Sequence, residues 1–127
     1  MVAAILLSFD IDGTLIDGDP PGPIQIDVVR HAIELGFIVG TASDRTVREQ
    51  RALWARHGLE PDFVGHKHHL GELRDRFEVT QFVHVGDTDV DAHYARLASF
   101  DFYYPWDFPL PGTTGASFWS QGSALAD

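Results

Sequence analysis

The sequence has 127 residues, the length of one ordinary domain, and nine Lys and Arg against nineteen Asp and Glu give it a net charge of −10. Nucleic acids and anionic membranes bind basic faces, so this charge argues against both as partners. The sequence contains no cysteine, which excludes disulfides, a thiolate nucleophile and Cys-ligated zinc. The apolar stretch from Val2 to Leu7 is too short to span a membrane and follows no basic leader, so we expect a soluble, cytoplasmic protein with no membrane partner.

Strand and helix patterns alternate along the chain. Short apolar runs predict strands, and apolar residues that recur every three or four positions predict helices. In chain order, the predicted elements are a strand at Val2–Phe9, a helix at Ile26–Leu35, a strand at Phe37–Ala42, a helix at Thr46–His57, a strand at Phe63–Val64, a helix at His69–Phe77, a strand at Gln81–Val85, a helix at Asp89–Ala98 and a strand at Phe100–Tyr104. This alternation predicts an α/β domain in which right-handed crossovers cover both faces of a mainly parallel, five-stranded sheet.

The composition changes after the last predicted strand. We expect residues 1–104 to form the folded core and residues 105–127 to form a C-terminal tail rich in Pro, Gly, Ser and Thr. The tail carries, among other apolar residues, Phe108, Leu110, Phe118, Trp119 and Leu125. Apolar side chains on such a segment need a surface to cover, so we expect the tail to pack on its own core or on a neighbouring subunit.

Polar residues follow four of the predicted strands at the points where these strands end. They are Asp10 and Asp12 after the first strand, Thr41 and Ser43 at the end of the second, Lys67 after the third, and Asp87 and Asp91 after the fourth. The carboxyl ends of parallel strands share one edge of a sheet, and such folds bind their ligands there. We therefore expect these side chains to meet in one site.

Four motifs, in this order, resemble those of the haloacid dehalogenase superfamily of phosphohydrolases. They are DIDGTLID from Asp10, IVGTASDR from Ile38, the lysine of VGHKHHL at position 67, and VGDTDVD from Val85. The resemblance extends from Ala3 to about Tyr104. It implies a Rossmann-like three-layer sandwich and a Mg²⁺-dependent reaction through an aspartyl-phosphate intermediate.

The resemblance also implies a role for each motif. Asp10 is the implied nucleophile, and Asp12 is the implied acid that protonates the leaving oxygen and later deprotonates the attacking water. Ser43 and Lys67 are implied to hold the transferring phosphoryl oxygens. The implied Mg²⁺ ligands are the Asp10 carboxylate, the main-chain carbonyl of Asp12 and the Asp87 carboxylate, with Asp91 behind them.

Further candidates for substrate contacts surround these motifs. Gly13 permits a tight turn with close backbone approach, and Thr14 is expected to hydrogen-bond within that turn. Thr41 competes with Ser43 as the phosphate-binding residue of the second motif, and the sequence leaves this choice open. Arg45, two residues after Ser43, is a candidate for direct contact with the substrate.

Superfamily members with small substrates usually carry a cap domain, and this sequence leaves no room for one. Residues 16–23 form a short loop, and residues 44–66 hold one helix and a weak strand. We therefore expect a capless protein whose open site is covered by a large substrate or by a second subunit. A homo-oligomer is thus a further expectation.

The predicted function is the hydrolysis of a phosphomonoester, on a small molecule or a macromolecule, by a Mg²⁺-dependent phosphatase. One alternative is a phosphotransferase or dehalogenase on the same scaffold, although a dehalogenase needs no acid such as Asp12. Another is a non-catalytic module that binds phosphate or resembles a receiver domain. A receiver domain places its acceptor aspartate after the third strand, where this sequence has Gly65, His66 and Lys67.

Overall fold

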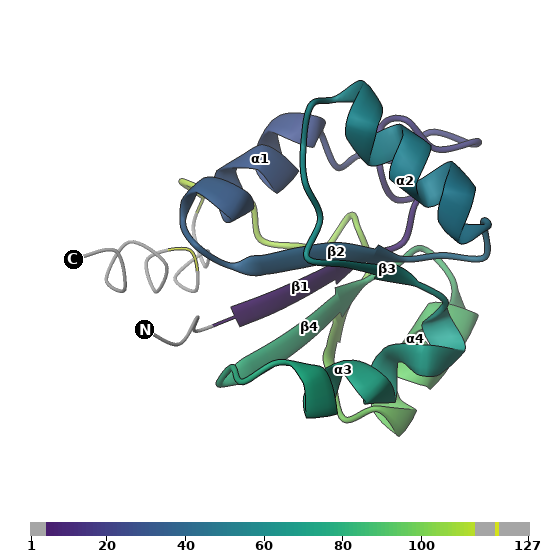
Figure 1. Ribbon diagram of the computed structural model, residues 1–127, viewed down its shortest axis with the longest axis vertical. Coiled ribbons are helices and arrows are strands. Elements are labelled where there is room, and N and C mark those ends of the chain that lie inside the picture. The colour runs from purple at the N-terminus through teal and green to yellow at the C-terminus, as the bar shows by residue number, and fades with distance from the viewer. Residues whose placement is uncertain (1–4, 114–118, 120–127) are drawn as a thin grey trace.

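The computed structural model describes residues 5–113 and residue 119, and within them five parallel strands form one sheet (Figure 1). The strands are β1 (Ile5–Phe9), β2 (Ile38–Ala42), β3 (Phe63–Gly65), β4 (Gln81–Val85) and β5 (Asp101–Tyr103), in the spatial order β3-β2-β1-β4-β5. This sheet confirms the predicted α/β fold of the Rossmann-like type. All of its strand pairs are parallel.

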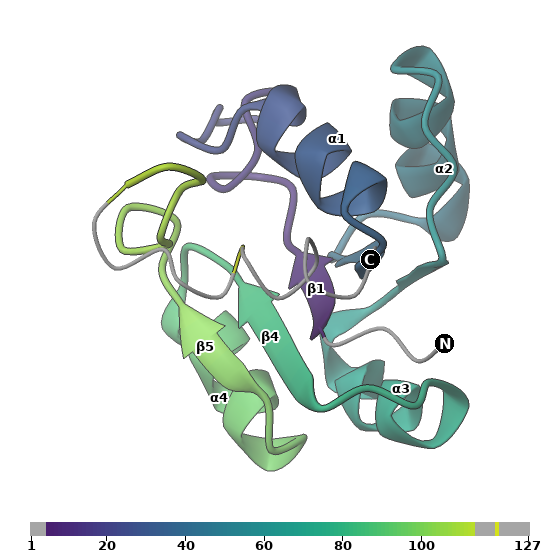
Figure 2. The same ribbon diagram turned by 90° about the vertical axis from the view of Figure 1, so that its left-hand side faces the viewer.

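Helices cover both faces of the sheet and produce three layers. The helices α1 (Ile26–Glu34) and α2 (Val47–Arg56) lie on one face, and α3 (Leu70–Arg76) and α4 (Asp89–Leu97) lie on the other (Figures 1 and 2). A single 3-10 turn, η1 (Lys67–His69), leads from β3 into α3. Each helix runs back across the sheet, so every following strand starts again from the same edge.

The central strand β1 is buried along its whole length because β2 and β4 pair with it on either side. Its side chains alternate between the two faces of the sheet. Ile5, Leu7 and Phe9 join the core under α1 and α2, whereas Leu6 joins the core under α3 and α4. The fourth residue, Ser8, is fully buried and polar.

The connections that follow β1 and β2 differ in content. After β1 the chain forms a loop that is closed by an isolated bridge between Leu15 and Ile24 before α1 begins. The connection from β2 to β3 contains α2 and no other helix or strand, and both connections are described throughout. Among the described helices, none has the length and apolarity that crossing a bilayer requires.

Two aromatic residues beyond β5 pack on the core of this chain. Phe108 is buried and meets the Phe9 and Tyr103 rings edge to face, with centroids 5.9 and 5.7 Å away. Trp119 is buried and stacks on Phe37 at 5.7 Å. Leu110 is exposed, and Phe118 and Leu125 lie outside the described residues.

Candidate active site

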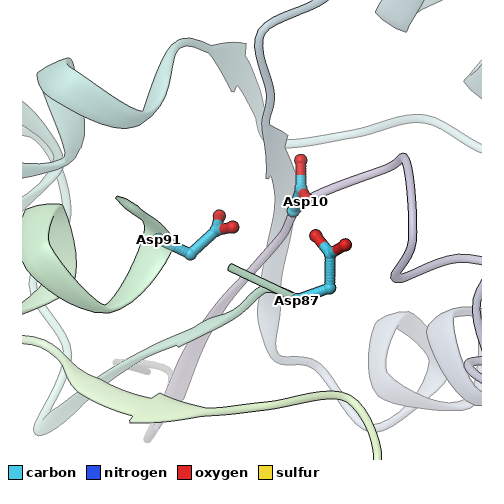
Figure 3. Close-up of side chains that lie close together, drawn as sticks. All are labelled: Asp10, Asp87 and Asp91. Carbon is cyan, nitrogen blue, oxygen red and sulfur yellow. The ribbon is translucent and has the colours of Figure 1, made fainter. Parts of the chain in front are cut away.

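Three aspartates converge at the carboxyl edge of the sheet. Asp10 directly follows β1, Asp87 follows β4, and Asp91 lies in the first turn of α4 (Figure 3). Each offers a carboxylate oxygen, and these oxygens lie within 4.8 Å of one another. Residues 5–113 and 119 contain no other such group of three or more metal-ligating side chains. The strand order reverses between β1 and β4, which is where open α/β sheets bind their ligands.

Two glycines leave the space that these carboxylates occupy. Gly13 has a φ of +75°, and a Cβ atom there would lie 1.9 Å from an Asp87 oxygen. A Cβ atom at Gly86 would lie 2.1 Å from the carboxyl carbon of Asp91. The turn after Asp10 thus needs glycine for both its backbone conformation and its contact with Asp87.

The positive charge near Asp10 does not balance the negative charge of its neighbours. The pKa of Asp10 is raised to about 8, chiefly by burial and next by the neighbouring Asp91, which raises it more than Lys67 lowers it. Its Oδ2 accepts a long hydrogen bond of 3.4 Å from the Thr14 hydroxyl, which is fully buried. A divalent cation between Asp10 and Asp87 would supply the missing charge, so the donor set fits an oxygen-preferring ion such as Mg²⁺.

Lys67 is the only lysine in the sequence, and its ammonium group lies among three carboxylates. Its Nζ is 3.3 Å from Asp91, 3.6 Å from Asp10 and 3.7 Å from Asp44. Burial alone would lower the pKa of Lys67, but the three carboxylates outweigh burial and raise it. The ammonium group therefore stays charged beside Asp10.

Asp91 is fully buried, and both of its oxygens have partners. Oδ1 lies 2.8 Å from Nε2 of His84, while Oδ2 accepts from the backbone N–H and the hydroxyl of Thr88 at 3.2 and 2.8 Å. Burial tends to raise the pKa of Asp91, but the hydrogen bond from His84 and the charge of Lys67 hold it below its usual value. The sequence analysis did not identify His84. It could have been recognised as a polar residue inside the mostly apolar strand at Gln81–Val85.

Asp12 turns toward Arg45. The guanidinium donates to both carboxylate oxygens, from Nε at 3.1 Å and from a terminal nitrogen at 2.6 Å. The backbone N–H of Asp19 adds a third hydrogen bond at 2.8 Å. The pKa of Asp12 is lowered, chiefly by the hydrogen bonds from Arg45. Arg45 therefore contacts the predicted acid, a pairing that the sequence analysis did not identify.

The two candidates of the second motif have different surroundings. Ser43 is fully buried at the end of β2, and its Oγ accepts the backbone N–H of Arg45 at 3.1 Å. The Thr41 hydroxyl donates to Gln50 at 2.7 Å and accepts from Trp54 at 3.1 Å, both on α2. The Thr41 hydroxyl is therefore engaged in the interface with α2, and the role of Thr41 as a substrate contact stays a prediction.

These side chains border one hollow at the sheet edge. Its volume is about 160 Å³, and its lining residues are Asp10, Asp12, Pro20, Asp44, Lys67, Asp87 and Thr88. The Asp44 side chain is 85% exposed, so the hollow opens directly to solvent. Of the predicted site residues, Gly13, Thr14, Arg45 and Asp91 do not line it but contact residues that do, and Ser43 directly precedes the lining residue Asp44.

Comparison of the sequence with models of known protein families and with curated proteins gives no match.

Proposed function

We propose that this protein is a Mg²⁺-dependent phosphatase that hydrolyses a phosphomonoester with Asp10 as the nucleophile. The observation that carries this proposal is the position of Asp10, which borders the hollow between a group of carboxylates and the only lysine of the chain. A phosphate dianion needs positive charge on its oxygens, and a carboxylate nucleophile needs to be ionised. A divalent cation bound near Lys67 would meet both needs, because it would add positive charge for the phosphate oxygens and would keep Asp10 ionised.

The carboxylates of Asp10 and Asp87 are the residues that would hold Mg²⁺. Asp91 would stay behind them, because His84 and Thr88 already occupy its oxygens. When bound, the cation supplies charge that ionises Asp10 and offsets the negative charge of the phosphate. Mg²⁺ prefers one or two carboxylates together with water and phosphate oxygens, which is the ligand set that this edge offers.

In the first step, an Asp10 oxygen attacks phosphorus, and the bond from phosphorus to the leaving oxygen breaks. Asp12 gives its proton to that oxygen. In the second step, Asp12 takes a proton from water, the water oxygen attacks phosphorus, and the bond to Asp10 breaks to release phosphate. Lys67 donates hydrogen bonds to the phosphoryl oxygens in both steps.

Asp12 can act as an acid only when it carries a proton, and its pair with Arg45 opposes this. The pair must therefore loosen when substrate enters. Arg45 has a natural second partner in the incoming phosphate, since guanidinium groups bind phosphate as they bind carboxylate. A phosphotransferase would use the same first step, but a hollow open to solvent favours water as the acceptor.

The test is phosphate release from a generic aryl phosphate, measured with and without Mg²⁺. We expect release that depends on Mg²⁺, that stops with a chelator and that is lost in Asp10→Asn. A fluoride-based phosphate mimic should bind against Asp10. Near-normal turnover by Asp10→Asn would rule out Asp10 as the nucleophile and with it this mechanism.

A further inference from the structure

A buried chain of hydrogen bonds leads from the middle of the sheet to the candidate active site. Ser8 of β1 and His84 of β4 are direct neighbours in the parallel register, and both side chains are fully buried. The Ser8 hydroxyl lies 2.9 Å from His84 Nδ1, and His84 Nε2 lies 2.8 Å from Asp91. From Asp91 the chain continues to Lys67 at 3.3 Å and from there to Asp10 at 3.6 Å.

These polar groups lie in an apolar part of the core. The neighbouring residues of the two strands on the same face are Leu6 and Phe82, and the Phe102 ring lies 6.3 Å from the imidazole. A polar side chain buried there costs free energy unless each of its groups is hydrogen-bonded. Both imidazole nitrogens have partners, and the described residues contain no buried side-chain polar atom without one.

The direction of the hydrogen bonds follows from the carboxylate. Asp91 accepts from Thr88 and lies beside the Lys67 ammonium, so it is ionised and has no proton to give. Nε2 of His84 must then carry the hydrogen and donate it to Asp91. Nδ1 lies within hydrogen-bond distance of the Ser8 hydroxyl, and these two partners fix the plane of the ring.

We infer that His84 is a positioning residue for Lys67, which it holds in place through Asp91. Without a donor at Nε2, Oδ1 of Asp91 would be a buried charged atom with no partner. The carboxylate would then turn to satisfy it and would draw Oδ2 away from Thr88 and Lys67. The contact between Lys67 and Asp91 is structural and independent of the reaction, whereas its catalytic consequence rests on the proposed function.

The sole lysine permits a direct measurement on the metal-free, full-length protein. With ¹⁵N-labelled lysine, the side-chain ammonium group gives one NMR signal, because Lys67 is the only lysine. Ammonium hydrogens exchange with water slowly only while they are held in buried ion pairs. The position and width of this signal therefore report whether Asp91 still holds Lys67.

Two amide substitutions at position 84 form a matched pair. The glutamine in His84→Gln reaches about as far as Nε2 and keeps a donor for Asp91, whereas the asparagine in His84→Asn reaches only as far as Nδ1. We expect the wild-type signal in His84→Gln and a shifted or broadened signal in His84→Asn. Equal signals from the two folded variants would overturn the inference.

Ser8→Ala provides a second variant if His84→Asn does not fold. It keeps the imidazole and removes only the partner of Nδ1. We therefore expect the Lys67 signal to change in the same direction as in His84→Asn, but by a smaller amount. An unchanged signal would overturn the inference.

Kinetics with Mg²⁺ and an aryl phosphate test the catalytic consequence. Outer residues that orient site residues typically contribute about 10- to 100-fold, so we expect kcat to fall by about that factor in His84→Asn, with KM nearly unchanged and with recovery in His84→Gln. Wild-type protein without phosphatase activity would refute the proposed function, while the Lys67 signal would still decide the inference. A changed signal with unchanged kcat would overturn the catalytic role of His84.

Discussion

Asp10 carries the largest conflict between burial and charge among the residues of the site. In the metal-free protein, the pKa of Asp10 is raised from 3.8 to about 8, first by burial and then by Asp91. The folded state therefore binds a proton at Asp10 more tightly than the unfolded state does. Through this group, stability is highest below pH 4 and is lost as the pH rises toward 8.

We predict that Mg²⁺ binds more tightly as the pH rises toward 8, because the metal and the proton compete for Asp10. The apparent affinity should increase by up to about tenfold per pH unit below that value. Isothermal titration calorimetry at pH 6, 7 and 8 measures this dependence. Asp10→Asn, which has no proton to lose, is the control and should bind Mg²⁺ weakly with little change across this range. Wild-type affinity that does not vary with pH would contradict the prediction.

Asp12 provides a second prediction for a single residue. Asp12→Asn keeps the shape of the side chain but cannot transfer a proton, so kcat should fall on the order of a hundredfold or more. The measurement is steady-state phosphate release with saturating Mg²⁺. Asp75→Asn makes the same charge change on the exposed surface of α3, away from the hollow, and is the matched control. Equal rates for the two variants would remove Asp12 from the mechanism.

Among the elements, α4 connects the fold most directly to the site. Its N-cap residue Thr88 accepts the backbone N–H of Asp91, and the Asp91 carboxylate accepts the backbone N–H of Thr88 in return. This reciprocal cap starts the helix and at the same time directs Asp91 toward Lys67. The geometry of the site is thus partly the geometry of a helix N-terminus.

We predict that Thr88→Ala lowers the free energy of unfolding by about 1 kcal/mol, the usual cost of losing an N-cap side chain. Chemical denaturation in urea measures this change. Thr88→Ser keeps the hydroxyl and should unfold at nearly the wild-type urea concentration. A Thr88→Ala variant as stable as Thr88→Ser would show that the hydroxyl contributes nothing to this helix start.

The apolar pattern of the sequence predicts the helices and strands well, because burial determines both the pattern and the positions of these elements. Apart from Ser8, the run ILLSF is apolar because β1 lies between two strands. Gly36 and Gly58 follow α1 and α2 with positive φ values of 87° and 66°. Edge elements are less well predicted. The strand predicted at Phe100–Tyr104 is limited to Asp101–Tyr103, because β5 has a partner on one side only.

The site is predicted in its position but not in its internal contacts. Strand ends identify Asp10, Lys67, Asp87 and Asp91, since parallel strands end at a common edge. The pairing of Ser8 with His84 depends on β4 lying beside β1, and no local pattern gives that strand order. Likewise, side chains alternate between the two faces of the sheet along β2, and the sequence does not show whether Thr41 points toward α2 or toward the substrate.

At the scale of the whole molecule, the segment after β5 completes the core. Trp119 lies against Phe37 and Phe108, and its indole N–H donates to the Pro109 carbonyl at 2.7 Å. Phe108 in turn covers Phe9 at the end of β1, next to the nucleophile candidate. The far end of the described chain therefore supports the layer on which the site is built.

We predict that Trp119→Ala lowers the free energy of unfolding by about 3 kcal/mol or more, as is usual when a buried aromatic side chain is removed. Trp106→Ala is the matched control, because this side chain is 64% exposed, and its loss should cost well under 1 kcal/mol. Urea denaturation of both variants measures the difference. Similar stabilities would mean that the segment after β5 adds little to the core.

The open hollow leads to a prediction about assembly. Because phosphoryl transfer benefits from the exclusion of water, we expect either a homo-oligomer whose second subunit covers the site or a macromolecular phosphoester that does so. Light scattering of the full-length protein gives its oligomeric state, and rates on aryl phosphate and on a phosphoprotein compare the two substrate classes. A monomer with full activity on small phosphate esters would contradict this expectation.

At the two glycines of the carboxyl edge, Gly13 and Gly86, one added methyl group would displace one chosen carboxylate of the site. Gly13→Ala would push against Asp87, whereas Gly86→Ala would push against Asp91, and neither substitution changes a charge. The first should therefore weaken the binding of the cation, and the second should disturb the Lys67 side of the hollow. Two alanines would thus separate the half of the site proposed to bind metal from the half proposed to bind phosphate, Gly86→Ala by steric displacement and Gly13→Ala by displacement together with backbone strain.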